Sequence, residues 1–323
     1  RAIVRPSLDN LSTVTLTTSH ILRYRGPDTV REEIAEGDLR GVLYFPRGVE
    51  SPPTLITMNG SDGGVYEPGA ALIATRGFAV LALASHDYAG RPDDLALIPL
   101  EYWREAIDYM RERFDDERTA LLGMSRGGEL ALLVPSIWPD RVDAVVANVP
   151  SNVVNSACCN PETWSKAAFT LNGEPVAFWE PDLSYEGFDP TSGLPMSYRL
   201  TYLKAMLGPD TIGPAIEVEK IDAPILLISG DADRLWPGDI AAKMVEKRLR
   251  EHGFAHEVVN VVHAGAGHWA TSTTHNTSAS PGLTEAGDRN DLPTGGTVRA
   301  NARAIHASVK LQLDFLRKYA RND

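Results

Sequence analysis

The amino-acid sequence predicts an α/β fold in which helices flank a mostly parallel central sheet. Apolar runs typical of buried strands alternate along the chain with segments of helical spacing, as a parallel sheet requires. One apolar run also passes through a tight glycine-containing turn directly into a helical segment. The chain has 323 residues, 43% of them hydrophobic, which is enough for one large core. We therefore expect residues 1–323 to form a single domain.

The expected elements follow in chain order from these patterns. Residues 14–24 and 38–45 predict an opening pair of strands, joined by a charged turn or short hairpin. Further strands are predicted at residues 54–58, 78–84, 119–122, 141–150 and 257–263 and in the run that begins at residue 224. Helices are predicted at residues 69–75, 99–114, 129–134 and 298–319.

The strongest functional signal is the pentapeptide Gly-Met-Ser-Arg-Gly at residues 123–127. It lies between a predicted strand and a predicted helix, where a serine on a strained turn needs glycines two residues away on each side. This context predicts a nucleophile elbow, the turn that presents the catalytic serine of α/β-hydrolases. Ser125 is therefore the candidate nucleophile. The alternative is that Ser125 only caps the helix, since serine is favoured at that position.

An elbow serine in this fold is followed along the chain by an acid and then by a histidine. Asp231 and Asp233 come directly after the strand that begins at residue 224. Asp233 is the preferred acid because the turn has left the sheet by that point, while Asp231 is expected to brace the turn. His268 lies in a run of small residues after the next strand and is the candidate base.

Two further histidines compete for the role of base. His86 and His263 each stand at the end of an apolar run that resembles a strand, where active-site loops begin. His268 is preferred because its neighbours are glycine and alanine and because it follows the acid in chain order.

These residue types fit one reaction. A serine hydroxyl is a poor nucleophile, so an imidazole must take its proton, and a carboxylate must orient that imidazole. The oxyanion that forms needs donors, and the backbone N–H of Arg126 is expected to be one of them. The second donor is expected at Ser61 or Asp62, in the glycine-rich loop of residues 59–64. That loop is alternatively an ordinary turn.

Two segments interrupt the alternation of strands and helices. Residues 151–214 contain prolines, glycines and many aromatic residues and predict a cap-like insertion over the pocket. The aromatic residues either line a substrate site or pack the insertion onto the body. Residues 271–296 form a long polar stretch, typical of a lid or a disordered loop. The candidate substrate-binding residues are His86, Tyr88, Trp164, Trp179 and Trp236.

Composition excludes several other classes of function. The net charge of −12 argues against a nucleic-acid partner. The two cysteines, Cys158 and Cys159, are adjacent and cannot join distant segments. Neither His/Cys spacing typical of a metal site nor a membrane-length apolar run occurs, so we expect no metal, no cofactor and no membrane span. We expect a cytoplasmic protein, although a start at Arg1 leaves an upstream segment open. The oligomeric state is not predicted.

Several stretches together resemble one family. They are residues 123–133, residues 216–237, the Ala-Gly-Ala-Gly-His run ending at His268 and the Gly-Gly-Thr of residues 295–297. The chain resembles the catalytic domain of acyl-CoA thioesterases and bile acid-CoA:amino acid N-acyltransferases. The resemblance implies a dienelactone-hydrolase-like α/β-hydrolase with Ser125, Asp233 and His268 as its triad. It also implies a small-molecule acyl ester or thioester as substrate and an acyl-enzyme intermediate.

Departures from the family's pattern shape the expected substrate. Residues 86–88 and 155–161 differ from it, and both segments are placed to touch substrate. A changed lining predicts a specialised ester, lactone or amide in place of a fatty acyl-CoA. Two other functions stay open, an acyltransferase that uses the same triad and a non-catalytic binding protein that retains the fold.

Overall fold

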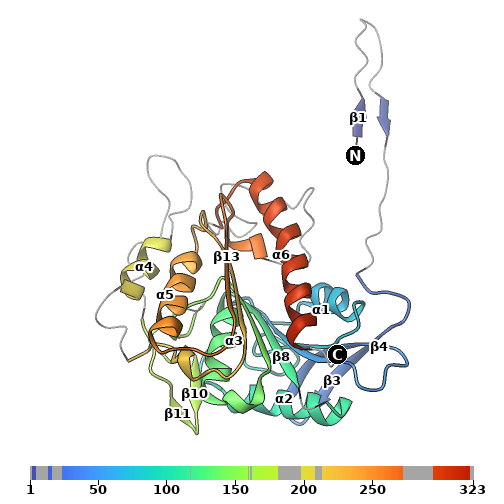
Figure 1. The fold of residues 1–323 in the computed structure, drawn as a ribbon, viewed down its shortest axis with the longest axis horizontal. Helices are drawn as coiled ribbons and strands as arrows, with labels where there is room; N and C mark the ends of the chain where they lie inside the picture. Colours follow the sequence, from blue (N-terminus) through green and yellow to red (C-terminus); the bar gives the residue numbers. More distant parts are fainter. Residues whose placement is uncertain are drawn as a thin grey trace, which may run out of the picture.

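The computed structural model describes residues 2–4, 14–16, 24–116, 118–158, 160, 162–180, 198–207, 213–271 and 294–320. Its centre is a twisted sheet of eight strands flanked by helices (Figure 1). The strands are β3 (Thr29–Glu36), β4 (Leu39–Pro46), β5 (Thr54–Met58), β6 (Ala79–Leu83), β8 (Thr119–Met124), β9 (Ala144–Asn148), β12 (Ile225–Gly230) and β13 (Val258–His263). Their spatial order is β13-β12-β9-β8-β5-β6-β4-β3.

Strand direction confirms the predicted mostly parallel sheet. All neighbouring pairs from β13 to β6 are parallel, whereas β4 is antiparallel both to β6 and to β3. The chain leaves β5 for β6 on one side and later returns to β8 on the other side. The carboxyl ends of β5 and β8 therefore form a topological switch point, where ligands bind in open α/β sheets.

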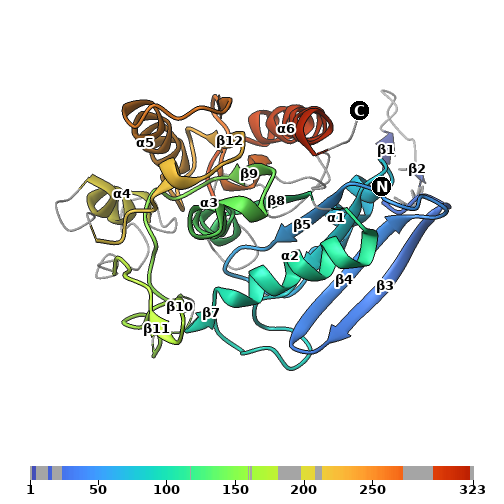
Figure 2. The ribbon, with the colours of Figure 1, turned by 60° about the horizontal axis from the view of Figure 1, so that its bottom comes forward.

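Helices cover both faces of the sheet (Figures 1 and 2). α2 (Glu101–Phe114), α3 (Arg126–Ile137) and α5 (Gly238–Glu251) pack on one face. α1 (Glu67–Ala74) and α6 (Val298–Tyr319) pack on the other. The four predicted helices are confirmed with ends shifted by three residues or fewer. α5 was not among the predicted elements, although its buried alanines, valine and leucine follow helical spacing.

The opening strand pair was predicted wrongly. The partner of β4 is the charged segment β3, not residues 14–24. Within that range, β2 (Val14–Leu16) pairs only with β1 (Ala2–Val4), and residues 17–23 lie outside the described part. β3 lies at the edge of the sheet (Figure 2) and buries only Thr29 and Ile34. An edge strand needs few apolar residues because most of its side chains face water, so apolar alternation fails to reveal it.

The described part of the predicted insertion contains regular elements. β10 (Phe169–Leu171) pairs with β11 (Glu174–Pro175) and with β7 (Ile98–Pro99) in a small second sheet. α4 (Arg199–Leu207) follows. Residues 159, 161, 181–197 and 208–212 of the insertion, and residues 272–293 of the polar stretch, lie outside the described residues.

Candidate active site

Ser125 stands at the turn between β8 and α3, at the switch point of the sheet. Its backbone has φ 59° and ψ −118°, a strained conformation for a residue with a side chain. Its N–H donates to the carbonyl of Asn148 at 3.0 Å, which ties the turn to the end of β9. Ser125 occupies the N-cap position, but its hydroxyl makes no capping hydrogen bond. The geometry is therefore that of an elbow and differs from the capping alternative.

The glycines around Ser125 are required by close backbone approaches. A Cβ on Gly123 would lie 1.9 Å from the carbonyl oxygen of Gly127. A Cβ on Gly127 would lie 2.3 Å from the carbonyl oxygen of Met58, at the end of β5. Real Cβ atoms do not approach backbone oxygens so closely, so a side chain at either position would force the turn open.

His268 and Asp233 meet at the carboxyl edge of the sheet. Nδ1 of His268 lies 2.7 Å from Oδ2 of Asp233, and both side chains are almost completely buried. The other oxygen, Oδ1, accepts the backbone N–H groups of Leu235 and Trp236 at 2.8 and 3.0 Å. The carboxylate holds the proton of a neutral imidazole on Nδ1, which leaves Nε2 as the acceptor.

Asp231, the rival acid, has a different role in the structure. Its side chain is exposed, and Oδ1 accepts the backbone N–H of Gly265 at 2.6 Å. It thus braces the loop that carries His268 without contacting the imidazole, as expected for a turn aspartate. The structure brings Asp233 to His268 and leaves Asp231 at the loop surface.

The loop that carries His268 is held by partners that sequence reasoning missed. The N–H of Gly267 donates to Oδ1 of Asn301 on α6 at 2.7 Å, and the N–H of His268 donates to the carbonyl of Thr294 at 2.7 Å. Asn301 is 1% exposed. Its position, three and four residues before the buried Ala304 and Ile305, places it on the core face of the helix. A polar residue on the core face of a predicted helix was the sequence signal that could have revealed this role of Asn301.

The first residue of α3 and the loop of residues 59–64 both lie next to Ser125. Arg126 is the first residue of α3, so its N–H has no acceptor within the helix. The loop of residues 59–64 follows β5, and a Cβ on Gly60 would lie 3.3 Å from the Cβ of Ser125. Asn59 closes this loop by donating from Nδ2 to the carbonyl of Gly63 at 2.7 Å. Ser61 and Asp62 occupy the turn between them.

His86 contacts that loop through the backbone of Ser61. Its side chain is 2% exposed, and Nε2 lies 3.1 Å from the carbonyl oxygen of Ser61. Since a carbonyl only accepts, Nε2 carries the proton and Nδ1 accepts from the hydroxyl of Ser85 at 2.9 Å. Burial lowers the pKa of His86, and the hydrogen bond to Ser61 partly opposes this shift. Both ring nitrogens of His86 are therefore engaged within the fold.

The remaining substrate-binding candidates have different surroundings. Trp236 is 3% exposed and donates from Nε1 to the carbonyl of Pro150 at 2.9 Å. Its ring centroid lies 4.6 Å from that of Tyr202 on α4, which in turn lies 5.9 Å from Trp179. Trp164, Trp179 and Tyr88 are partly exposed. Of the five candidates, Trp236 and His86 are thus buried, and the other three keep accessible surface.

The rival base His263 is half-buried at the end of β13. Its Nε2 lies 3.0 Å from the hydroxyl oxygen of Ser308 on α6, and burial lowers the pKa of the imidazole. No acidic side chain accompanies this hydrogen bond in the described residues, in contrast to the pair of His268 and Asp233.

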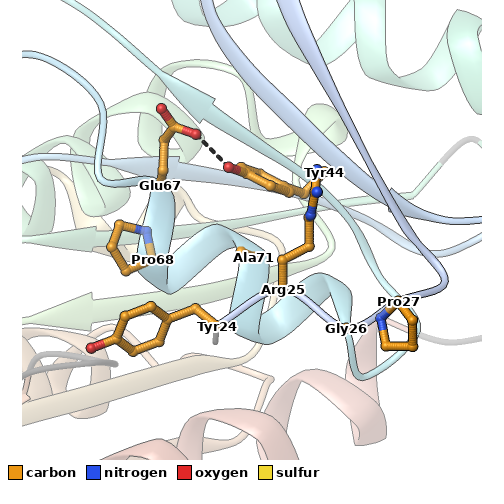
Figure 3. Close-up of a pocket in the computed structure, with 8 residues that line it drawn as sticks. All are labelled: Tyr24, Arg25, Gly26, Pro27, Tyr44, Glu67, Pro68 and Ala71. Atoms are coloured by element: carbon orange, nitrogen blue, oxygen red, sulfur yellow. Dashed lines mark hydrogen bonds between the residues drawn. The ribbon is translucent and has the colours of Figure 1, made fainter. Parts of the chain in front are cut away.

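One cavity of about 590 Å³ lies apart from these residues (Figure 3). It is lined by residues 24–27, Tyr44 and Glu67, Pro68 and Ala71 of α1. The carboxylate of Glu67 there accepts from Tyr44 and, through both oxygens, from Arg31 at 2.7 and 3.0 Å. The Arg31 guanidinium lowers the pKa of Glu67. The carboxylate of Glu67 is thus engaged by Arg31 and Tyr44 within the fold. None of the predicted site residues lines this cavity.

No group of three or more His, Cys, Asp or Glu side chains in the described residues is arranged to hold a metal ion. No helix in that part of the chain combines the length and apolar character needed to cross a bilayer.

Comparison with known proteins shows which family the chain belongs to. Residues 98–322 match the family described as "BAAT / Acyl-CoA thioester hydrolase C terminal". The chain is 29% identical over 238 residues to acyl-coenzyme A thioesterase 6 of Mus musculus, which covers 72% of this chain and 52% of that protein. It is 30% identical over 248 residues to acyl-coenzyme A amino acid N-acyltransferase 2 of Rattus norvegicus, covering 76% and 55%. The chain therefore spans about half the length of the curated relatives it matches.

A solved structure agrees at the level of the fold. A protein from Klebsiella pneumoniae subsp. pneumoniae described as a dienelactone hydrolase superposes with a TM-score of 0.52. The superposition covers 90% of this chain and 98% of that one at 14% sequence identity, which supports the α/β-hydrolase fold alone. The family match and the sequence relatives go further, and the chain belongs to the BAAT / Acyl-CoA thioester hydrolase C-terminal family.

Proposed function

We propose that this protein is a serine-dependent acyl hydrolase that cleaves an acyl ester or thioester through a triad of Ser125, His268 and Asp233. The observation that carries the proposal is the buried contact of 2.7 Å between His268 and Asp233. It lies at the same edge of the sheet as the strained elbow of Ser125. Membership of the family supports acyl chemistry at this site.

The proposed reaction proceeds in two halves. The hydroxyl of Ser125 attacks the acyl carbonyl while Nε2 of His268 takes its proton, and the buried carboxylate of Asp233 stabilises the imidazolium. The proton then passes to the leaving thiolate or alkoxide as the bond to the acyl group breaks. Water, activated by the same Nε2, hydrolyses the resulting acyl-serine and returns the proton to Ser125.

Stabilisation of the tetrahedral oxyanion is assigned to two backbone donors. The first is the N–H of Arg126, which the N-terminus of α3 leaves without a helical acceptor. The second is the N–H of Ser61 or Asp62, in the loop held by His86. Such preorganised donors contribute roughly 10²–10³-fold to turnover in serine hydrolases.

Substrate contacts are assigned to the accessible candidates. Tyr88, Trp164 and Trp179 keep exposed surface, and residues 151–214 are proposed to form the cap that carries the two tryptophans. A coenzyme A thioester is the first substrate class to test, because thioesterases of that name are among the relatives.

Acyl transfer is the second candidate function. It is favoured by the similarity to an N-acyltransferase. The same acyl-serine would then react with an amine in place of water, so hydrolysis and transfer share every step up to that intermediate.

The test is to incubate the protein with a panel of p-nitrophenyl esters and acyl-CoA thioesters, with and without an amino acid such as glycine as acceptor. Intact mass and released product are recorded for the wild type and for Ser125→Ala. The proposal expects an added acyl mass and turnover that both disappear in Ser125→Ala. Turnover that persists in this variant contradicts the triad, and an amidated product in place of free acid selects transfer.

A further inference from the structure

The side chain of Arg126, the residue after the proposed nucleophile, is buried. It is 3% exposed, although arginine is rarely buried without specific partners. Nη1 donates to Oε2 of Glu129 at 3.0 Å. Nη2 donates to the carbonyl oxygens of Asn155 and Ser156 at 3.1 and 3.0 Å. One guanidinium thus joins the first turn of α3 to the backbone that opens the predicted cap.

Glu129 completes this connection from the same turn of α3. Its carboxylate is 0% exposed and accepts the backbone N–H of Asn155 at 3.2 Å and its side-chain Nδ2 at 2.6 Å. Burial raises the pKa of Glu129, while the charge of Arg126 and the bonds from Asn155 oppose the rise. Asn155 is therefore held by both members of the ion pair, and Ser156 is held by Arg126.

A contribution to folding stability does not by itself explain why these charged side chains are buried together. A buried ion pair is commonly no more stabilising than apolar residues of similar volume, because both charges must leave water. Nε of Arg126 and Oδ1 of Asn155 are also buried without a hydrogen-bond partner in the described structure, which adds a cost. Features that lower stability concentrate at functional sites, where geometry matters more.

The cluster fixes two parts of the proposed site relative to each other. On one side is the start of α3, with Ser125 and the N–H of Arg126. On the other is the strand-like segment through Asn155, which bridges in parallel to Trp179, and Ser156, which bridges to Ala167. Removing the guanidinium would take away the two hydrogen bonds that it donates to this segment, without touching the backbone N–H of Arg126.

We propose that the side chain of Arg126, paired with Glu129, is a positioning residue for the acyl-transfer step. It holds residues 155–156 against the elbow and so aims the N–H of Arg126 at the substrate carbonyl. The inference rests on the proposed function. A displacement of about 1 Å in a catalytic group can cost roughly 10²-fold in rate, so loosening this contact should affect acylation more than binding.

The decisive variant is the double substitution Arg126→Met and Glu129→Leu. It removes both charges together, so no unpaired charge stays buried. A second variant, Arg126→Lys, keeps the positive charge but lacks the planar fork that reaches two carbonyls and a carboxylate at once. Either variant, once shown to fold by circular dichroism and thermal unfolding, serves as the test.

The matched control is the pair of Arg248 and Glu219. It is also a forked ion pair, with contacts of 2.5 and 2.6 Å, but it joins the far end of α5 to the short helix of residues 218–220. The corresponding double substitution to Met and Leu should leave acylation within about twofold of wild type, since the pair has no contact with the elbow.

The measurement is the acylation rate constant from the burst of p-nitrophenolate, together with KM. We expect a fall of about 10- to 100-fold in acylation for both Arg126 variants, with KM changed by less than about threefold. Acylation within about threefold of wild type in either folded variant overturns the inference while the proposed function stands. Failure of the wild type to form any Ser125-dependent adduct removes the proposed function, and the inference with it.

Discussion

Nδ1 of His268 lies 2.7 Å from Oδ2 of Asp233, although 35 residues separate them along the chain. The contact follows from the pairing of β12 with β13, in which Gly230 lies opposite His263. Because the two strands are parallel, the loops that follow them leave from the same edge of the sheet. A Cβ on Gly230 would lie 2.2 Å from the carbonyl oxygen of Ala266, so the absence of a side chain there lets the loops touch.

The first prediction concerns the proposed nucleophile and base as a unit. Ser125→Ala and His268→Ala should each lower kcat by about 10³-fold or more, because each removes a step that the other requires. The double variant should cost no more than the worse single variant. Steady-state kinetics with one p-nitrophenyl ester measures this, with thermal unfolding as the control. Losses that multiply in the double variant would show that the two residues act separately.

The second prediction separates the two aspartates. Asp233→Asn should lower kcat by about 10⁴-fold, because an amide no longer selects the Nδ1–H tautomer of His268. Asp231→Asn keeps a side-chain oxygen that can accept the N–H of Gly265, and Asp231 does not contact His268, so this change should cost about tenfold or less in kcat. Both variants are compared under the same assay at neutral pH. Equal losses would argue against the assignment of Asp233 as the acid.

The third prediction concerns the elbow glycines. Gly127→Ala should lower the free energy of unfolding by about 1–3 kcal/mol or more, because its Cβ would lie 2.3 Å from the carbonyl oxygen of Met58. Urea unfolding measures the loss. The control is Gly213→Ala, where, apart from its chain neighbours, no atom of the described residues lies within 4 Å of the new Cβ. That change should stay within about 1 kcal/mol. Equal effects of the two substitutions would contradict the tight turn.

The fourth prediction is a pH dependence of stability that arises from His86. Burial lowers the pKa of its imidazole from the ordinary value of 6.5. Below about 6.5 the unfolded chain therefore binds a proton that the folded protein resists, so this contribution to stability is present above that pH and is lost as the pH falls. In His86→Gln, Nε2 can still donate to Ser61 but does not titrate in this range.

The corresponding measurement is urea unfolding near pH 7.5 and near pH 5.5. The wild type should lose more stability between these conditions than His86→Gln does. His263, whose pKa burial also lowers, remains in both proteins and contributes equally to both differences. An identical loss in the two proteins would show that His86 does not titrate in the way its burial indicates.

Much of the fold was predictable from the chain, and the reason is visible in particular strands. Residues 54–58 were predicted as a strand and form β5 with the same ends, because a central parallel strand is buried on both faces and reads as an apolar run. β3 was not predicted, because most side chains of this edge strand face water and the strand therefore lacks an apolar pattern. The role of Asn301 in holding the loop of His268 was not predicted, because its partner, Gly267, is 34 residues away in sequence.

The sequence by itself determined the elbow and the order of Ser125, Asp233 and His268, since local sterics require the glycines and the fold requires the order. Only the tertiary structure decided which aspartate meets His268, since Asp231 and Asp233 are two residues apart and the direction of each depends on the loop beside it. The same holds for Arg126. Its burial against Asn155 arises from chain segments that meet only when the sheet is assembled.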